Sequence, residues 1–186
     1  RFASKHVKMV LTGEGSDEML GGYEKYFLES YGAIYRKLIP GIIRKSIVAG
    51  PINLLPESFW RWKFAINTLN IMDDGERTSQ WFGGLRPAEI AELLNIRNPP
   101  SLKGIGISEM DGKLGSLLNF DQRYWLPDNL LERGDRMTMA ASLEARMPFM
   151  DVNLARFAAQ LPDRMRVKSR TTKRILRLAM QESIPR

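Results

Sequence analysis

The chain has 186 residues, of which 44% are hydrophobic and 26% are charged, and its formal net charge is +7. This composition is sufficient for a packed core and argues against general disorder. The absence of cysteine excludes disulfides, zinc sites with thiolate ligands and a cysteine nucleophile in this chain, and it is compatible with a cytoplasmic location. No apolar run has the length of a transmembrane helix, so we expect no membrane partner.

The two ends of the sequence and its basic residues also carry information. The chain starts at Arg1 instead of Met, and it stops at Arg186 without a polar tail. We therefore expect a piece of a longer protein. From residue 162 onward, eight basic residues stand against two acidic ones. Such a local cluster indicates a phosphate-binding surface more strongly than an evenly basic protein would.

The first predicted element is a buried strand over residues 6–12, which is rich in Val, Leu and Met and is followed by Gly13. Ser16 is a suitable N-cap for a helix that we expect to run to Phe27. The unit therefore reads as a strand, a glycine-containing loop and a helix. His6 is the only histidine, and we expect it to be structural. A histidine-based triad and a multi-histidine metal site are therefore excluded in this chain.

Most of the remaining chain shows the apolar spacing of three and four residues that is typical of helices. This spacing predicts helical segments at residues 31–38, 40–49, 57–69, 74–82, 87–95 and 108–123. The stretch 98–106 contains two prolines and two glycines and is predicted to be a loop. A further helix is expected to begin at Pro127, because proline favours the first helical position, and to end at Ala145 before Pro148.

Two more helices complete the prediction. Asp151 is expected to cap a helix that runs to Leu161, and Thr171 or Thr172 a last helix that runs to Glu182. The sequence thus predicts a mainly α-helical chain with one clear strand. Because one strand cannot form a sheet, its partners must lie outside the chain or be poorly signalled within it.

The loop after the strand is the first candidate site. It places three carboxylates, those of Glu14, Asp17 and Glu18, where a strand ends and a helix begins, and ligands of open α/β sheets bind at such places. Because carboxylates repel phosphate, a bare phosphate cradle does not suit this loop, whereas a Mg²⁺ ion between a carboxylate and phosphate oxygens does. The alternative is a tight turn with an acidic, well-capped helix start, and the motif alone leaves both interpretations open.

The helix predicted from Pro127 holds the second candidate group. Gly134 lies on its apolar face and permits close approach of another segment. Asp135 lies at the edge of a second apolar stripe, so its carboxylate needs a partner, either a buried arginine or a substrate group. Structural and functional roles both remain open for Asp135. For Arg136 we favour a helix-surface ion pair with Glu132, four residues earlier.

The third candidate site is the start of the last predicted helix. Lys173 and Arg174 fall in its first turn, where the helix dipole prefers acidic residues. A basic residue in that position indicates a bound anion. The alternative is a solvated basic face, since Lys173 and Arg177 are four residues apart.

Three segments, in this order, carry a family resemblance. Residues 12–23 read Thr-Gly-Glu-Gly-Ser-Asp-Glu-Met-Leu-Gly-Gly-Tyr. Residues 126–151 include Leu-Pro-Asp-Asn-Leu-Leu, Asp-Arg-Met-Thr-Met-Ala and Ser-Leu-Glu-Ala-Arg-Met-Pro-Phe-Met-Asp, and residues 172–177 read Thr-Lys-Arg-Ile-Leu-Arg. The combination resembles the asparagine synthase domain of glutamine-hydrolysing asparagine synthetases. The stretch from about 30 to 105 carries no matching motif.

The resemblance implies that residues 1–186 are the C-terminal portion of an ATP-pyrophosphatase-type synthetase domain. The parent domain would have an α/β fold, with a parallel sheet flanked by helices, similar to the adenine-nucleotide alpha-hydrolases. Such enzymes activate the side-chain carboxylate of aspartate with ATP and Mg²⁺, giving β-aspartyl-AMP and pyrophosphate. Ammonia, released from glutamine by a separate N-terminal domain, then displaces AMP. The resemblance is also compatible with a homodimer of the full protein.

The resemblance further implies roles for five residues. Thr12 and Gly13 would line the nucleotide site, and Asp17 would bind the nucleotide phosphates through Mg²⁺. Glu14 would lie beside the acyl-adenylate and take the proton of the incoming amine. Lys173 would neutralise the pyrophosphate leaving group. Glu14 and Lys173 are thus the expected catalytic residues.

The sequence departs from the family pattern in ways that leave alternatives open. Thr12 replaces the usual Ser but keeps its hydroxyl. The family's Ser-Gly-Gly-x-Asp-Ser pyrophosphate loop and the glutaminase domain are absent from the chain and are expected upstream of Arg1, so we expect the isolated chain to be inactive. A related synthetase could adenylate another carboxylate, as in the formation of β-lactam antibiotics or of amidated sugars and peptides. A non-catalytic module that binds nucleic acid through the basic C-terminal stretch is a third, less favoured hypothesis, because it leaves the acidic loop unexplained.

Overall fold

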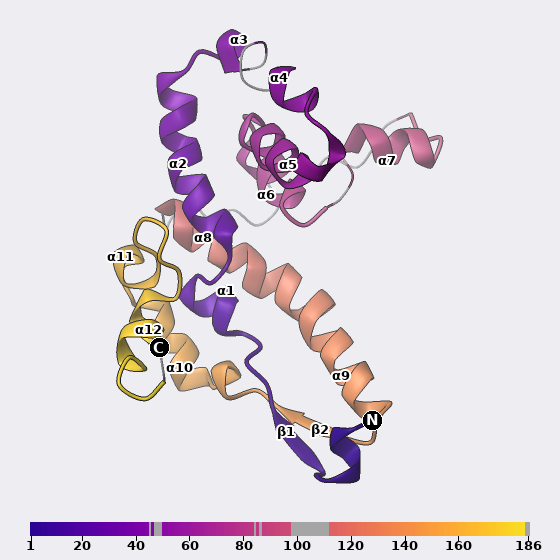
Figure 1. The fold of residues 1–186 in the computed structure, drawn as a ribbon, viewed down its shortest axis with the longest axis vertical. Coiled ribbons are helices and arrows are strands. Elements are labelled where there is room, and N and C mark those ends of the chain that lie inside the picture. The colour runs from indigo at the N-terminus through magenta and orange to yellow at the C-terminus, as the bar shows by residue number, and fades with distance from the viewer. Residues whose placement is uncertain (45, 47–49, 84, 86, 98–111, 185–186) are drawn as a thin grey trace. The chain divides into compact units, whose positions relative to one another are not determined.

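The computed structural model describes residues 1–44, 46, 50–83, 85, 87–97 and 112–184 (Figure 1). The chain forms two compact units. The first consists of Arg1–Phe27 and Ser108–Arg186, and the second consists of Leu28–Ile107. The loop predicted at 98–106 lies outside the described residues.

The first unit contains a two-stranded parallel sheet. A short 3₁₀ turn, η1 (Ala3–Lys5), precedes β1 (Met9–Leu11), and β1 pairs with β2 (Glu144–Arg146) in the register Val10 to Ala145. The predicted strand is thus confirmed over its central residues, but the prediction that it is buried is wrong, because Met9 and Leu11 are exposed and Val10 is half-buried. The prediction that a helix runs to Ala145 is wrong, because the chain turns at Ser142, whose φ is +54°, and residues 144–146 instead satisfy backbone groups of β1.

A long continuous helix crosses the first unit (Figure 1). It comprises α8 (Gly112–Phe120), the π-helical segment η5 (Asp121–Leu131) and α9 (Glu132–Met139). The prediction of a new helix at Pro127 is wrong, because Pro127 lies inside η5. Proline cannot donate the usual helical hydrogen bond and its ring crowds the carbonyl four residues earlier. The wider π-helical turns accommodate that defect without ending the helix.

The helix expected from Ser16 to Phe27 is in fact two helices, α1 (Ser16–Leu20) and α2 (Glu24–Leu38). The predicted cap at Ser16 is wrong, because Gly15 occupies the N-cap position and Ser16 is the first helical residue. The break occurs at Gly21, whose φ is +72°, and the backbone N–H groups of Gly21 and Gly22 both donate to the carbonyl of Asp17 at 2.9 Å. A side chain on Gly21 would also approach Val167 Cγ2 to 2.7 Å. Both the turn and the packing therefore require glycine at this position.

The remaining helices of the first unit follow β2 and a 3₁₀ turn, η6 (Pro148–Met150). They are α10 (Val152–Ala159), α11 (Asp163–Arg166) and α12 (Arg174–Ala179). The predicted cap at Asp151 is confirmed, since its carboxylate accepts from the N–H groups of Asn153 and Leu154. The predicted threonine cap of the last helix is wrong, because Lys173 occupies the N-cap position with a φ of +47°.

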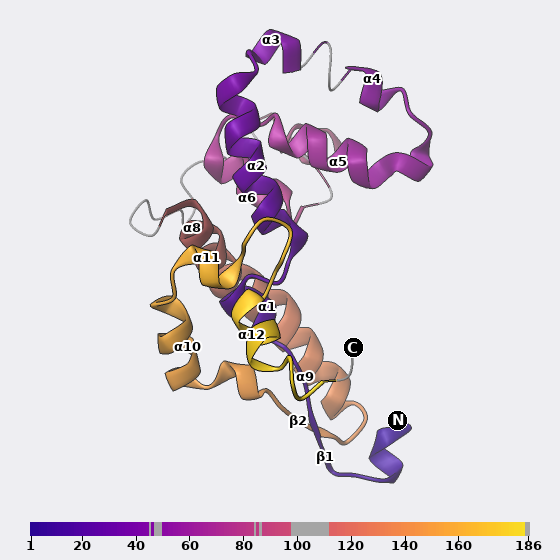
Figure 2. The same cartoon turned by 60° about the vertical axis from the view of Figure 1, so that its left-hand side comes forward.

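Helix α1 is anchored in the core of the first unit. Met19 and Leu20 are buried against Ala158 of α10 and against Ile175 and Leu176 of α12. A second cluster joins Tyr26 of α2 to Leu114, Leu117 and Leu118 of α8. In the ribbon of Figure 2, as in Figure 1, α1 lies beside α12, and it also contacts α10 and the long helix. The short helix that follows the acidic loop is thus fixed on several sides.

Helices are the only regular elements in the described part of the second unit. It contains most of α2, and the elements that follow are α3 (Gly41–Ile43), α4 (Gly50–Asn53), η3 (Glu57–Phe59), α5 (Trp60–Leu69), α6 (Asp74–Gln80) and α7 (Pro87–Leu93). The helical segments expected here are confirmed, although the one at 40–49 is described only in part.

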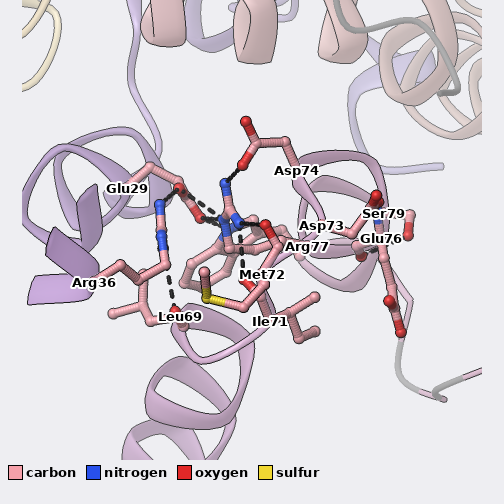
Figure 3. Close-up of polar contacts among 11 residues, drawn as sticks. Glu29, Arg36, Leu69, Ile71, Met72, Asp73, Asp74, Glu76, Arg77 and Ser79 are labelled. Carbon is pink, nitrogen blue, oxygen red and sulfur yellow. Dashed lines mark hydrogen bonds and ion pairs between the residues drawn. The ribbon is translucent and has the colours of Figure 1, made fainter. Parts of the chain in front are cut away.

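A buried polar cluster links three helices of the second unit (Figure 3). The carboxylate of Glu29 on α2 accepts from Nε of Arg77 on α6 at 2.9 Å and from Nη2 of Arg36 at 3.1 Å, and Trp81 Nε1 donates to it as well. Arg77 also donates to the carbonyl of Ile71 after α5. A buried carboxylate with several charged donors is well compensated, so the cluster is a structural tie.

The expectation of a mainly helical chain is therefore confirmed, and its strand belongs to a small parallel sheet. Among the described residues, no helix combines the length and the apolar character that a membrane span requires.

Candidate functional site

The loop between β1 and α1 is held in shape by local contacts. The hydroxyl of Ser16 donates to the carbonyl of Gly13 at 2.7 Å, which closes the loop at the start of α1. Gly15 has a φ of +88°, and a Cβ there would lie 2.6 Å from Met150 Sδ. The glycine is therefore needed both for the backbone conformation and for the close approach of the turn η6.

Asp17 and Lys173 form the centre of the candidate site. Lys173 Nζ lies 3.0 Å from Asp17 Oδ2 and donates to the hydroxyl of Ser16 at 2.9 Å. The two side chains are about three-quarters and two-thirds buried, with exposures of 23% for Lys173 and 33% for Asp17. The structure thus brings together an acid and a base that are far apart in the sequence. A solvated basic face does not describe Lys173.

Gly22 makes this arrangement sterically feasible. A Cβ at that position would lie 1.6 Å from Asp17 Oδ1 and 2.4 Å from Lys173 Cε. The backbone N–H of Lys173 also donates to the carbonyl of Gly21 at 3.2 Å. The double-glycine turn is therefore the surface on which the Asp17–Lys173 pair rests. Sequence reasoning used this turn only as a motif and did not foresee its steric role.

Glu14 and Thr12 lie at the other end of the loop. The carboxylate of Glu14 packs on Gly134 of α9, where a Cβ would approach Glu14 Oε2 to 3.0 Å. Glu14 Oε2 and the Thr12 hydroxyl are both buried, and neither has a hydrogen-bond partner among the described residues. Buried polar atoms are normally satisfied, so these two oxygens have hydrogen-bonding capacity that the described chain leaves unused. The close approach predicted for Gly134 is present.

Gly13 presents open space. A Cβ placed on Gly13 would meet no atom within 4 Å, and its backbone does not adopt a positive φ. The fold therefore does not itself require glycine there. A glycine that the fold does not need is consistent with a backbone that a ligand approaches closely.

A buried polar group behind α1 was missed by sequence reasoning. Glu18 is 1% exposed, and its carboxylate accepts from the hydroxyl of Tyr23. Burial and the hydrogen bond to Glu18 raise the pKa of Tyr23 well above its usual value, so the phenol stays protonated. Glu18 therefore helps to support α1. Its position in the acidic loop would also have allowed an exposed side chain that binds a ligand, but the side chain is buried.

A buried ion pair completes that support. Asp121 of the long helix is fully buried and lies 2.8 Å from Nζ of Lys25, and it also accepts from the hydroxyl of Tyr26. Burial raises the pKa of Asp121 to about 6, although the nearby Lys25 opposes the shift, and burial lowers the pKa of Lys25 to about 8. The pair holds the start of α2 against the long helix.

The second predicted group has a smaller role than expected. Asp135 is exposed and lines a shallow surface depression with Lys8, Met139 and Ser142, so its carboxylate needs no buried partner. The predicted ion pair between Arg136 and Glu132 is confirmed, and both side chains are exposed. Such a pair contributes little to stability.

The described residues do not form a metal cage. Nowhere in the part of the chain that the structure describes do three His, Cys, Asp or Glu side chains gather closely enough to hold a metal ion. Mg²⁺, however, is commonly bound by one or two carboxylates together with substrate phosphates. Asp17 is partly exposed beside Lys173, so its carboxylate fits that kind of shared site.

Comparison with known proteins gives consistent relatives. A putative glutamine-hydrolyzing asparagine synthetase of Mycobacterium tuberculosis is 32% identical over 195 residues, which cover 100% of this chain and 29% of the relative. The glutamine-hydrolyzing asparagine synthetase 1 of Bacillus subtilis is 27% identical over 204 residues, which cover 98% of this chain and 29% of the relative. Asparagine synthetase 3 of the same organism is 43% identical over 61 residues, which cover 33% of this chain and 10% of the relative.

The chain thus spans less than a third of the length of these relatives. No solved structure matches it significantly. The profile of the family described as Asparagine synthase matches residues 1–186, the whole of the sequence. On that match, the chain belongs to the asparagine synthase family.

Proposed function

We propose that the protein containing this chain adenylates the side-chain carboxylate of aspartate and converts it to asparagine. A carboxylate oxygen attacks the α-phosphorus of ATP, which gives β-aspartyl-AMP and releases pyrophosphate. Ammonia then attacks the acyl carbon, the bond to AMP breaks, and asparagine and AMP are formed after loss of a proton. Glutamine would supply the ammonia through a domain outside this chain, and a cytoplasmic location accords with the use of ATP.

The contact between Asp17 and Lys173 across Gly22 carries this proposal. An acid that can share a metal with phosphate and a base that can neutralise phosphate lie 3.0 Å apart at the start of α1. The carboxylate of Asp17 would hold Mg²⁺ in the proposed complex, and the ion would supply positive charge against the phosphates. The ammonium group of Lys173, released from Asp17, would then stabilise the charge that develops on the leaving pyrophosphate.

The two unsatisfied oxygens support a reacting group beside the loop. The hydroxyl of Thr12 would donate to the nucleotide, and the backbone at Gly13 would permit its close approach. Glu14 would accept the proton of the attacking amine, because a carboxylate held against the helix backbone at Gly134 is oriented and has an oxygen without a partner.

The proposal concerns the full-length protein. Because the chain spans 29% of its relatives, the remaining parts of the nucleotide site and the ammonia source would lie in the rest of the protein. The test is to incubate the full-length protein with ATP, Mg²⁺, glutamine and aspartate and to quantify asparagine and AMP by chromatography. We expect equal amounts of both and none from residues 1–186 alone. Amide formation from another acid, with none from aspartate, would replace aspartate with that acid as the substrate.

Glu14→Gln tests the proposed proton acceptor. The substitution keeps the size and packing of the side chain but removes its basicity, so we expect amide formation by the full-length protein to fall by about 100-fold or more. The apparent melting temperature should remain unchanged. Glu132→Gln on the exposed surface of α9 is the matched control and should retain full activity. Full activity of Glu14→Gln would exclude Glu14 as the proton acceptor.

A further inference from the structure

The position of the Asp17–Lys173 pair depends on the double-glycine turn, residues 21–22. Lys173 is tied to this turn through its own backbone, and Asp17 accepts from both glycine N–H groups through its carbonyl. The two side chains then meet above Gly22. A small displacement of the turn would therefore move the acid and the base together, away from any bound phosphate.

Two neighbouring residues of the long helix hold the turn from both sides. Before the turn, Gln122 Nε2 donates to the carbonyl of Glu18 at 2.9 Å. After the turn, Asp121 accepts from Lys25 Nζ and from the hydroxyl of Tyr26. Glu18 and Lys25 thus flank the double glycine, and both are connected to one point of the long helix. The same helix also supports the carboxylate of Glu14 at Gly134.

We propose that Gln122, acting with Asp121, is a positioning residue that sets the double-glycine turn, and with it the Asp17–Lys173 pair, on the long helix. This inference rests on the proposed function. The long helix is then the common reference for both ends of the site, since Glu14 packs on it directly and the turn is connected to it through two adjacent side chains.

Substitutions of the two positioning residues should differ in their effect on the stability of the fold. Asp121 is fully buried and pairs with Lys25, so removing its charge would break a buried ion pair and destabilise the fold. Gln122 is an exposed residue on the helix and contributes one hydrogen bond. Its substitution should therefore affect the turn with little effect on folding, which makes it the informative position.

The test compares two variants of Gln122 in the full-length protein. Gln122→Met keeps the length of the side chain but has no donor, and Gln122→Lys keeps a donor with similar reach. For Gln122→Met we expect the concentrations of Mg²⁺ and pyrophosphate at half-maximal ATP–pyrophosphate exchange to rise about fivefold, the effect typical of one lost hydrogen bond. The KM for aspartate should not change. Gln122→Lys and the neighbouring exposed control Arg123→Gln should resemble the wild type.

The outcomes separate this inference from the proposed function. If the wild-type protein shows no ATP–pyrophosphate exchange, the proposed function is contradicted and the kinetic comparison has no reference. Hydrogen–deuterium exchange of the backbone amides of residues 17–26 is therefore measured in parallel by mass spectrometry. Faster hydrogen–deuterium exchange in Gln122→Met, but not in Gln122→Lys, supports the positioning role. Wild-type behaviour of Gln122→Met in both measurements overturns it, as would equal impairment of Gln122→Met and Gln122→Lys, because donation would then not be the relevant property.

Discussion

Lys173→Gly should abolish most of the adenylation activity of the full-length protein while leaving its stability nearly unchanged. Lys173 adopts a φ of +47°, a conformation that costs a residue with a side chain about 1 kcal/mol and costs glycine little. The partly exposed ion pair with Asp17 contributes at most about 1 kcal/mol. These two effects offset each other, so the apparent melting temperature should shift by no more than ~2 °C.

The loss of activity has a separate cause. Without the ammonium group, Lys173 no longer offsets the charge that develops on the departing pyrophosphate, and we expect ATP–pyrophosphate exchange to fall by about 10²–10³-fold. Ser169 also has a positive φ, of +53°, so Ser169→Gly is a matched control that relieves the same backbone cost without changing charge. It should be fully active. Exchange by Lys173→Gly within a factor of two of the wild type would remove Lys173 from the site.

Gly22→Ala should have an effect of similar size through sterics alone. The backbone of Gly22 does not adopt a positive φ, so alanine is conformationally acceptable, but its Cβ would overlap Asp17 Oδ1 and crowd Lys173 Cε. Both obstructing atoms belong to side chains that can rotate away, so we expect the fold to persist with a loss of about 1–3 kcal/mol. The displaced acid and base should lower exchange by about 100-fold.

Gly41→Ala is the control for that substitution. Gly41 also lacks a positive φ, and the nearest atom to an added Cβ is Arg44 Nη2 at an ordinary 3.6 Å. This variant should match the wild type in exchange and in melting temperature. A fully active Gly22→Ala would show that the contact of Asp17 with Lys173 across the turn is dispensable for adenylation.

Much of the local structure near the site could be predicted because its signals are local. The strand around Val10, the glycine loop and the helix start at Ser16 follow from residue types at short spacing, as does the cap at Asp151. Gly21 also carried a signal, since glycine is frequent just after a helix end, but the helix was expected to continue to Phe27.

Other features depend on partners that are distant in sequence. β2 is a three-residue segment with two charged side chains, and only its pairing with β1 makes it a strand. The meeting of Asp17 with Lys173 is likewise a tertiary contact without a local pattern.

For Asp121 a signal was present and was overlooked. It follows Leu114, Leu117 and Leu118 at the spacing of one helix face, which places a carboxylate on the buried side. A charged residue on an apolar face predicts a buried partner, and Lys25 is that partner. The role of Gln122 had no such pattern, because it arises from a single side-chain bond to the backbone carbonyl of Glu18.

The most direct test of the account is aspartate-dependent ATP–pyrophosphate exchange by the full-length protein with Mg²⁺ and without any ammonia source. This half-reaction reports only on formation of the acyl-adenylate, to which Thr12, Gly13, Asp17 and Lys173 are assigned. We predict exchange that requires aspartate and Mg²⁺, that is absent for residues 1–186 alone and that is lost in Lys173→Gly. Exchange that is stimulated by a different acid and not by aspartate, or that persists undiminished in Lys173→Gly, would contradict the account.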